Sequence, residues 1–103
     1  MVIQLNPSDD NRVVQAQPGD RVEVVVSNPI GTWCTWRVQD VRGASAAFLK
    51  DEWLHTQPAG MCGGSDLRRF VFEVNGRGQT TVVMVLDDPS PRTYQRFSFV
   101  VTV

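Results

Sequence analysis

The sequence predicts an all-β fold, and three observations carry that prediction. Short runs of β-branched and aromatic residues recur along the 103 residues, and in most of these runs apolar and polar positions alternate with a period of two. Clusters of Gly, Pro, Asn and Asp separate the runs, as turns do in all-β proteins. Helical periodicity is nearly absent. We therefore expect one domain over residues 1–103, built from about seven short strands.

The alternation also predicts where the strands lie. We expect strands, in chain order, at residues 12–16, 21–26, 33–39, 67–74, 80–86 and 94–103. Between them we expect turns or loops at residues 17–20, 27–32, 60–64, 75–78 and 87–92. The stretch 46–50 is compatible with a short strand or with a helical turn. This number of strands and this rhythm of turns favour an immunoglobulin-like β-sandwich with Greek-key connections, with a small barrel as the alternative.

Several residues within these segments carry specific expectations. Trp36 shares a face with Cys34 and Val38, so we expect Trp36 in the core. Pro29 cannot donate a hydrogen bond to a β-ladder, which favours a loop at 27–32. The pair Asn75-Gly76 suits a tight turn with two positive φ angles.

The charge balance argues against nucleic acid as a partner. Ten Lys and Arg residues face eleven Asp and Glu residues, for a net charge of −1, whereas nucleic-acid binding depends on clustered basic residues. The basic pair Arg68-Arg69 is expected on the exposed side of a strand. The sequence also has no apolar stretch near the ~20 residues that cross a bilayer, so we expect no membrane partner. No signal peptide is visible, which predicts a periplasmic or secreted protein if one was removed and a cytoplasmic protein otherwise.

The residues that could support catalysis are few, so we expect a protein that is not an enzyme. His55 is the one histidine, which excludes any site that needs two, and neither cysteine has a neighbouring group that would orient it in a thiol dyad. The acidic pair Asp87-Asp88 stands beside a proline, as solvated turn residues do. Two cysteines and one histidine at wide spacing also lack the close ligand pairs of zinc sites, and we expect neither metal nor cofactor.

The two cysteines leave one question open. Cys34 follows the loop predicted at 27–32, and Cys62 lies inside the glycine-rich loop predicted at 60–64. If these loops lie side by side, a disulfide would join them and add roughly 3–4 kcal/mol by the chain-entropy model. In a reducing compartment the same residues would be two thiols.

Taken in order, the predicted loops resemble those of a known family. Residues 27–36 read Ser-Asn-Pro-Ile-Gly-Thr-Trp-Cys-Thr-Trp, which is similar to the motif Asn-Pro-Thr-Thr-Gly-aromatic-x-Trp of the chagasin-like inhibitors of papain-type cysteine proteases. Residues 60–64 resemble the Gly-x-Gly-Gly loop of that family, and residues 96–101 resemble its last strand. The resemblance runs from about Val13 to Val103.

The resemblance implies an immunoglobulin-like sandwich whose three clustered loops block the cleft of a papain-family cysteine protease reversibly and without being cut. We expect such a protein to act as a monomer. The residues that the resemblance assigns to protease binding are Asn28, Pro29, Ile30, Gly31, Thr32, Trp33, Gly60, Met61, Cys62, Gly63, Gly64, Pro89, Pro91 and Arg92.

The chain departs from the family pattern in each loop. The first loop is one residue longer, and Gly31-Thr32 reverses the usual order of these two residue types. The second loop carries Cys62 within the glycine pattern. The third loop, at 87–92, has no aromatic residue where the family has Arg-Pro-Trp. Besides an inhibitor, the sequence is therefore compatible with an immunoglobulin-like binding or adhesion module without inhibitory activity, or with a structural domain.

Overall fold

The computed structural model describes residues 1–29, 34–54, 65–87 and 93–103. These residues form eight strands and one short 3-10 helix, η1 (Pro7–Asp9). The strands, in chain order, are β1 (Val2–Leu5), β2 (Arg12–Gln15), β3 (Arg21–Pro29), β4 (Thr35–Arg42), β5 (Ala46–Leu54), β6 (Ser65–Val74), β7 (Gln79–Asp87) and β8 (Thr93–Thr102). In this part of the chain, no helix has the length and apolar character to span a membrane.

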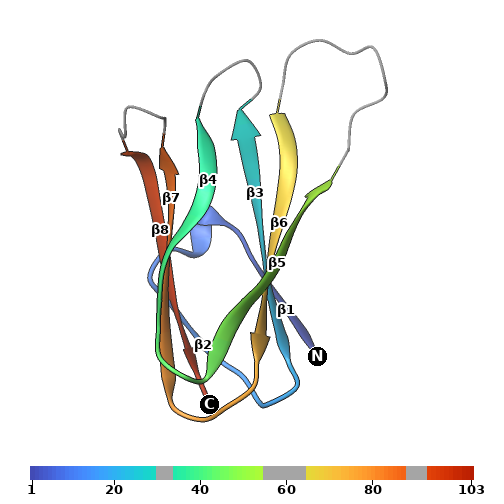
Figure 1. Cartoon of the computed structure of the whole chain (residues 1–103), viewed down its shortest axis with the longest axis vertical. Coiled ribbons are helices and arrows are strands. Elements are labelled where there is room, and N and C mark those ends of the chain that lie inside the picture. Colours follow the sequence, from blue (N-terminus) through green and yellow to red (C-terminus); the bar gives the residue numbers. More distant parts are fainter. Residues whose placement is uncertain (30–33, 55–64, 88–92) are drawn as a thin grey trace.

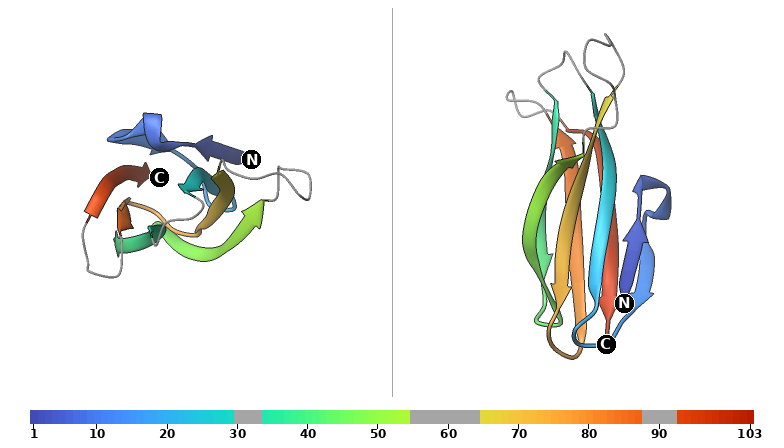
Figure 2. Two further views of the ribbon diagram at one scale, coloured as in Figure 1. Left: turned by 90° about the horizontal axis from the view of Figure 1, so that it is seen from above. Right: turned by 90° about the vertical axis from the view of Figure 1, so that its right-hand side faces the viewer.

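The strands form two four-stranded sheets that face each other as two layers (Figures 1 and 2). One sheet has the order β1-β3-β6-β5 and the other the order β2-β8-β7-β4. The β5–β6 and β7–β8 neighbours are antiparallel hairpins, whereas β1 pairs with β3, and β2 with β8, in parallel. The expected β-sandwich is confirmed, and two separate sheets rule out the barrel alternative.

Alternation with a period of two builds the core between the sheets. On β3, β6 and β8, three alternating side chains of each strand point inward and are almost completely buried: Val22, Val24 and Val26; Phe70, Phe72 and Val74; Phe97, Phe99 and Val101. The rings of Phe72 and Phe99 meet edge to face across the two sheets, with 5.6 Å between their centroids. Each of these side chains contributes about 1.5–3 kcal/mol when it leaves water.

Strand β4 confirms the prediction made for its tryptophan. The side chain of Trp36 is 2% exposed, and Cys34 and Val38 pack against the same core from the same face. Thr35 and Arg37, on the opposite face, are exposed. The alternation therefore places one aromatic side chain of β4 at the centre of the sandwich.

Strand β3 is longer than the sequence predicts, because Ser27, Asn28 and Pro29 continue it instead of forming a loop. Pro29 pairs with Ser65 of β6. On the other side β3 pairs with β1 only over Arg21–Val24, so among the described residues the last part of β3 is an edge. A proline is tolerated at such an edge, where its missing N–H removes no ladder hydrogen bond.

Strand β5 resolves the choice left open for the middle of the chain. The stretch 46–50 is the first half of a nine-residue strand, with a bulge between Phe48 and Lys50. Most of its side chains are exposed because β5 is the last strand of its sheet. A mostly exposed edge strand has little apolar alternation, which is why periodicity could not identify it.

The predicted turns at 17–20 and 75–78 lie within the described residues, and the second has a different geometry from the one expected. At the first turn the N–H of Asp20 donates to the carbonyl of Gln17, 3.0 Å away. At 75–78 the positive φ belongs to Gly78 (106°) and not to the pair Asn75-Gly76. Gly76 is required for another reason, since a Cβ there would lie 2.6 Å from the carbonyl oxygen of Ala44.

Candidate functional site

One end of the sandwich gathers the strand ends that flank the three predicted loops. Figure 1 shows the last residues of β3, β5 and β7 and the first residues of β4, β6 and β8 at the same end. The pairings agree, since Pro29 lies opposite Ser65, and Asp87 lies opposite both Thr35 and Thr93. We call this the loop end. The strands carry segments 30–33, 55–64 and 88–92 from one shared platform.

The structure places only part of the predicted binding residues. Asn28 and Pro29 are the last two residues of β3, and their backbones pair with Asp66 and Ser65. The other predicted binding residues lie outside the described residues: Ile30, Gly31, Thr32, Trp33, Gly60, Met61, Cys62, Gly63, Gly64, Pro89, Pro91 and Arg92. Their assignment to protease binding stays a prediction.

The base of segment 30–33 is closed by a hydrogen bond between the two sheets. The indole Nε1 of Trp36 donates to the backbone carbonyl of Ser27, with 3.2 Å between the two atoms. Ser27 lies near the end of β3 and Trp36 near the start of β4. The buried tryptophan therefore fixes both sides of the segment relative to each other.

The base of segment 88–92 is held by an ion pair. The guanidinium group of Arg37 on β4 binds the carboxylate of Asp87 at the end of β7, with N–O distances of 2.8 and 2.9 Å. Asp87 is 7% exposed. The expectation of a solvated loop acid at this position is wrong, because the carboxylate faces a guanidinium group on the neighbouring strand and Asp87 ends a strand.

Arg68 of β6 connects three strands at the loop end, a role that the sequence did not predict. Its Nη1 donates to Thr35 Oγ1 at 3.0 Å and to the backbone carbonyl of Trp36 at 2.9 Å, so this β6 side chain crosses to the other sheet. Its Nε donates to the carboxylate of Asp51 on β5 at 2.8 Å. Arg68 therefore joins the strand that follows segment 30–33 to both strands that flank segment 55–64.

The expected exposed position of Arg68 is wrong, and the sequence contained the signal for its true place. The side chain is 17% exposed and lies on the face of β6 that also carries Phe70 and Phe72. Side chains two positions apart in a strand point to the same face, so Arg68 shares the inner face with Phe70. Near the end of a sandwich, an inward arginine reaches carbonyl and carboxylate partners.

Arg69, the next residue, points to the outer face and holds a separate charge cluster. Its guanidinium group binds Glu52 of β5 at 2.6 and 2.8 Å and lies 3.7 Å from Glu23 of β3. The hydrogen bond from Arg69 lowers the pKa of Glu52 below its ordinary value of 4.5. It also raises the pKa of Arg69.

We expect this ion pair to stabilise the fold at neutral pH and to weaken in acid. Because the pKa of Glu52 is lowered in the folded state, its contribution is complete above pH 4.5 and is lost as the pH falls through the lowered value. An NMR titration of the Glu52 carboxyl should give a midpoint below 4.5, and the variant Arg69→Met should raise it. A midpoint that does not move in the variant contradicts the assignment to Arg69.

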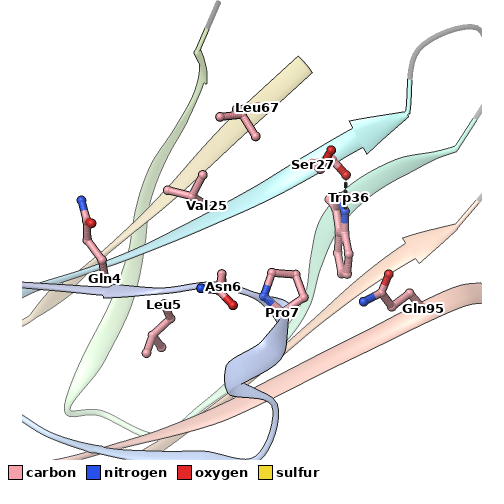
Figure 3. Close-up of a pocket in the computed structure, with 9 residues that line it drawn as sticks. All are labelled: Gln4, Leu5, Asn6, Pro7, Val25, Ser27, Trp36, Leu67 and Gln95. Carbon is pink, nitrogen blue, oxygen red and sulfur yellow. Dashed lines mark hydrogen bonds between the residues drawn. The ribbon is translucent and has the colours of Figure 1, made fainter. Parts of the chain in front are cut away.

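One groove in the described part of the structure lacks catalytic side chains. It has a volume of about 620 Å³ and lies where the chain crosses from β1 through η1 to the other sheet (Figure 3). Its walls are formed by Gln4, Leu5, Asn6, Pro7, Val25, Ser27, Trp36, Leu67 and Gln95. None of these side chains is an acid or base at neutral pH. The described residues also contain no group of three or more His, Cys, Asp or Glu side chains that could hold a metal ion.

The cysteine question stays open. Cys34 lies just before β4 and is half-buried, packed against the core. Cys62 and His55 lie outside the described residues. A disulfide between Cys34 and Cys62 therefore stays a prediction.

Comparison with known proteins identifies the fold. No protein-family model matches this chain, and no curated protein matches it significantly in sequence. The crystal structure of the cysteine protease inhibitor EhICP2 from Entamoeba histolytica is similar over 99% of this chain and 95% of that one, with a TM-score of 0.83 at 15% identity. The solution structure of amebosin is similar over 100% and 98%, with a TM-score of 0.81 at 17% identity.

A third similar structure contains a partner. PbICP-C, solved in complex with falcipain-2, matches 97% of this chain over 95% of its own length, with a TM-score of 0.57 at 16% identity. At these identities the likeness establishes the fold. The chain has the immunoglobulin-like sandwich of the chagasin-like inhibitors, as the loop motifs predicted.

Proposed function

We propose that this protein is a reversible, non-covalent inhibitor of papain-like cysteine proteases that blocks the active-site cleft with the three segments of the loop end. The observation that carries the proposal is the convergence of three pairs of strand ends on one platform, each pair flanking a segment that contains a predicted binding loop. Rigid strands that present short segments lower the ordering cost of binding.

Three further observations support this proposal. The similarity to EhICP2, a cysteine protease inhibitor, extends over nearly the whole length of both chains. The complex of PbICP-C with falcipain-2 supports a cysteine protease as the partner. The cross-links at the base of the segments, from Trp36, Arg37 and Arg68, give the platform the rigidity that such an inhibitor needs.

The direct test is inhibition of papain and of a cathepsin L-type protease. We expect steady-state inhibition that is lost on dilution, and mass spectrometry should find the protein uncut after prolonged incubation. If micromolar protein leaves both enzymes fully active, the proposal fails. Binding of other proteins through the loop end would then favour the alternative, an immunoglobulin-like binding module, which the two aspartates of the predicted third loop at 87–92 also fit.

The predicted loop residues can be tested by a paired substitution. We expect the double variant Asn28→Ala, Gly63→Ala to weaken inhibition at least about tenfold, while its melting temperature stays within a few degrees of wild type. Inhibition constants and thermal melts measure the two effects. The control is Asn75→Ala, since Asn75 is exposed in the turn between β6 and β7 at the opposite end of the sandwich. A large loss of stability in the double variant would instead make these residues part of the scaffold.

A further inference from the structure

Strand β5 presents large apolar side chains to solvent, and one of them stands at the loop end. Phe48, Leu49 and Trp53 are 42%, 44% and 47% exposed. Trp53 is the last residue but one of β5, two positions before segment 55–64, whereas Phe48 lies in the first half of the strand. Trp53 is thus an exposed aromatic at the edge of the proposed inhibitory surface.

The ring of Trp53 is held in place by a cation. Trp53 lies directly opposite Arg68 in the pairing of β5 with β6. The guanidinium carbon of Arg68 lies 5.1 Å from the centre of the Trp53 ring and 4.7 Å from the centre of the Phe70 ring. A cation over an aromatic ring at such a distance is attracted by the ring electrons. The hydrogen bonds of Arg68 to Asp51 and to the Trp36 carbonyl fix the guanidinium group in turn.

An immobilised, half-exposed tryptophan has the properties of an interface anchor. Tryptophan and arginine are the residue types most enriched among residues that dominate binding energy. An anchor that is already ordered loses little conformational entropy when a partner covers it. Residues 87–92, by contrast, contain no aromatic side chain. Trp53 therefore supplies a large aromatic contact on the side of segment 55–64.

We infer that Trp53, supported by Arg68, is a fourth protease contact beside the three segments, and that it packs against the rim of the cleft of a papain-like cysteine protease. This inference rests on the proposed inhibitory function. Trp53, a residue of strand β5, would then contribute part of the affinity for the protease, whereas the resemblance implied binding through the three loops. The inference also gives a reason for the contact between the inward-facing Arg68 and the exposed ring of Trp53.

The test compares two exposed aromatics of the same strand. We expect Trp53→Ala to raise the inhibition constant for papain about tenfold, which corresponds to about 1.4 kcal/mol. The matched control is Phe48→Ala, whose ring contacts Phe70 and Phe72 away from the loop end and whose removal should change the inhibition constant less than about twofold. Trp53→Phe, which keeps a ring beneath Arg68, should lie between Trp53→Ala and wild type. Thermal melts of all three variants show whether each is folded.

A second measurement uses the unmodified protein. Hydroxyl-radical oxidation read by mass spectrometry should label Trp53 in the free protein, and papain with a blocked catalytic cysteine should protect it while Phe48 stays reactive. If the wild type inhibits papain but Trp53 is neither protected nor needed for affinity, this inference is wrong and the proposed function stands. If the wild type neither inhibits nor binds papain, the proposed function fails and this inference fails with it.

Discussion

Replacing Arg68 with methionine is expected to weaken inhibition of papain by at least about thirtyfold. The substitution removes the hydrogen bonds to Thr35 and to the Trp36 carbonyl, the ion pair with Asp51 and the cation above Trp53. The strand that follows segment 30–33 and the two strands that flank segment 55–64 then lose their cross-link, and part of their ordering must occur on binding. A loss of about 2 kcal/mol in binding free energy corresponds to the thirtyfold change.

The neighbouring arginine is the natural control for this experiment. Arg69→Met removes the same charge from the same strand, but its partners Glu52 and Glu23 lie on the outer face. We expect Arg69→Met to leave the inhibition constant within about twofold of wild type. Arg68→Lys keeps the charge but lacks the planar fork that reaches several acceptors at once, so it should restore inhibition only in part. Equal effects at Arg68 and Arg69 would mean that net charge, and not the cross-link, governs inhibition.

Replacing Trp36 with alanine is expected to destabilise the protein by about 3–5 kcal/mol, because a fully buried indole leaves a cavity in the core. Domains of this size unfold at a cost of about 5–15 kcal/mol, so this is a large part of the total stability. Chemical denaturation should show a lower midpoint with an unchanged slope.

Two further variants separate the contributions of Trp36. Trp36→Phe keeps most of the buried ring but leaves the Ser27 carbonyl without its donor, at a cost of about 1–3 kcal/mol. We expect it to loosen the base of segment 30–33 and to weaken inhibition even where the protein is folded. Trp53→Ala, at a half-exposed ring, should cost much less stability than Trp36→Ala. Similar losses for the two tryptophans would contradict the assignment of Trp36 to the core.

The fold was predictable where one face of a strand is buried and the other is not. The inward positions of β3, β6 and β8 follow from alternation alone, and so does the burial of Trp36. Strand β1 was not predicted, because it has only four residues and three of them are apolar, so it shows no clear alternation. Strand β5 was missed over most of its length because edge strands carry exposed side chains.

The sequence predicted where the candidate site lies, but not the ion pair and hydrogen bonds that join the strands beneath it. Turn-forming residues and loop motifs indicated which segments meet at one end. The ion pair of Arg37 with Asp87 and the contacts of Arg68 join residues that are 50 and 32 positions apart in the chain. Nothing in local composition links such positions, since their proximity depends on how the two sheets are stacked. A charged residue in register with core positions, as Arg68 is with Phe70, is the signal that could have indicated the cross-link.

The parallel pairing of β2 with β8 has a consequence for how the chain folds. Arg12 lies opposite Phe99 and Gln15 opposite Thr102, so the second strand to be synthesised completes its pairing only with the last. During translation β2 therefore stays unpaired until β8 has left the ribosome. Pairings over such long sequence separations slow folding, since the loop must close before any contact forms. We expect refolding to be rate-limited by the docking of β2 onto β8, with the local antiparallel pairings of β5 with β6 and of β7 with β8 formed earlier.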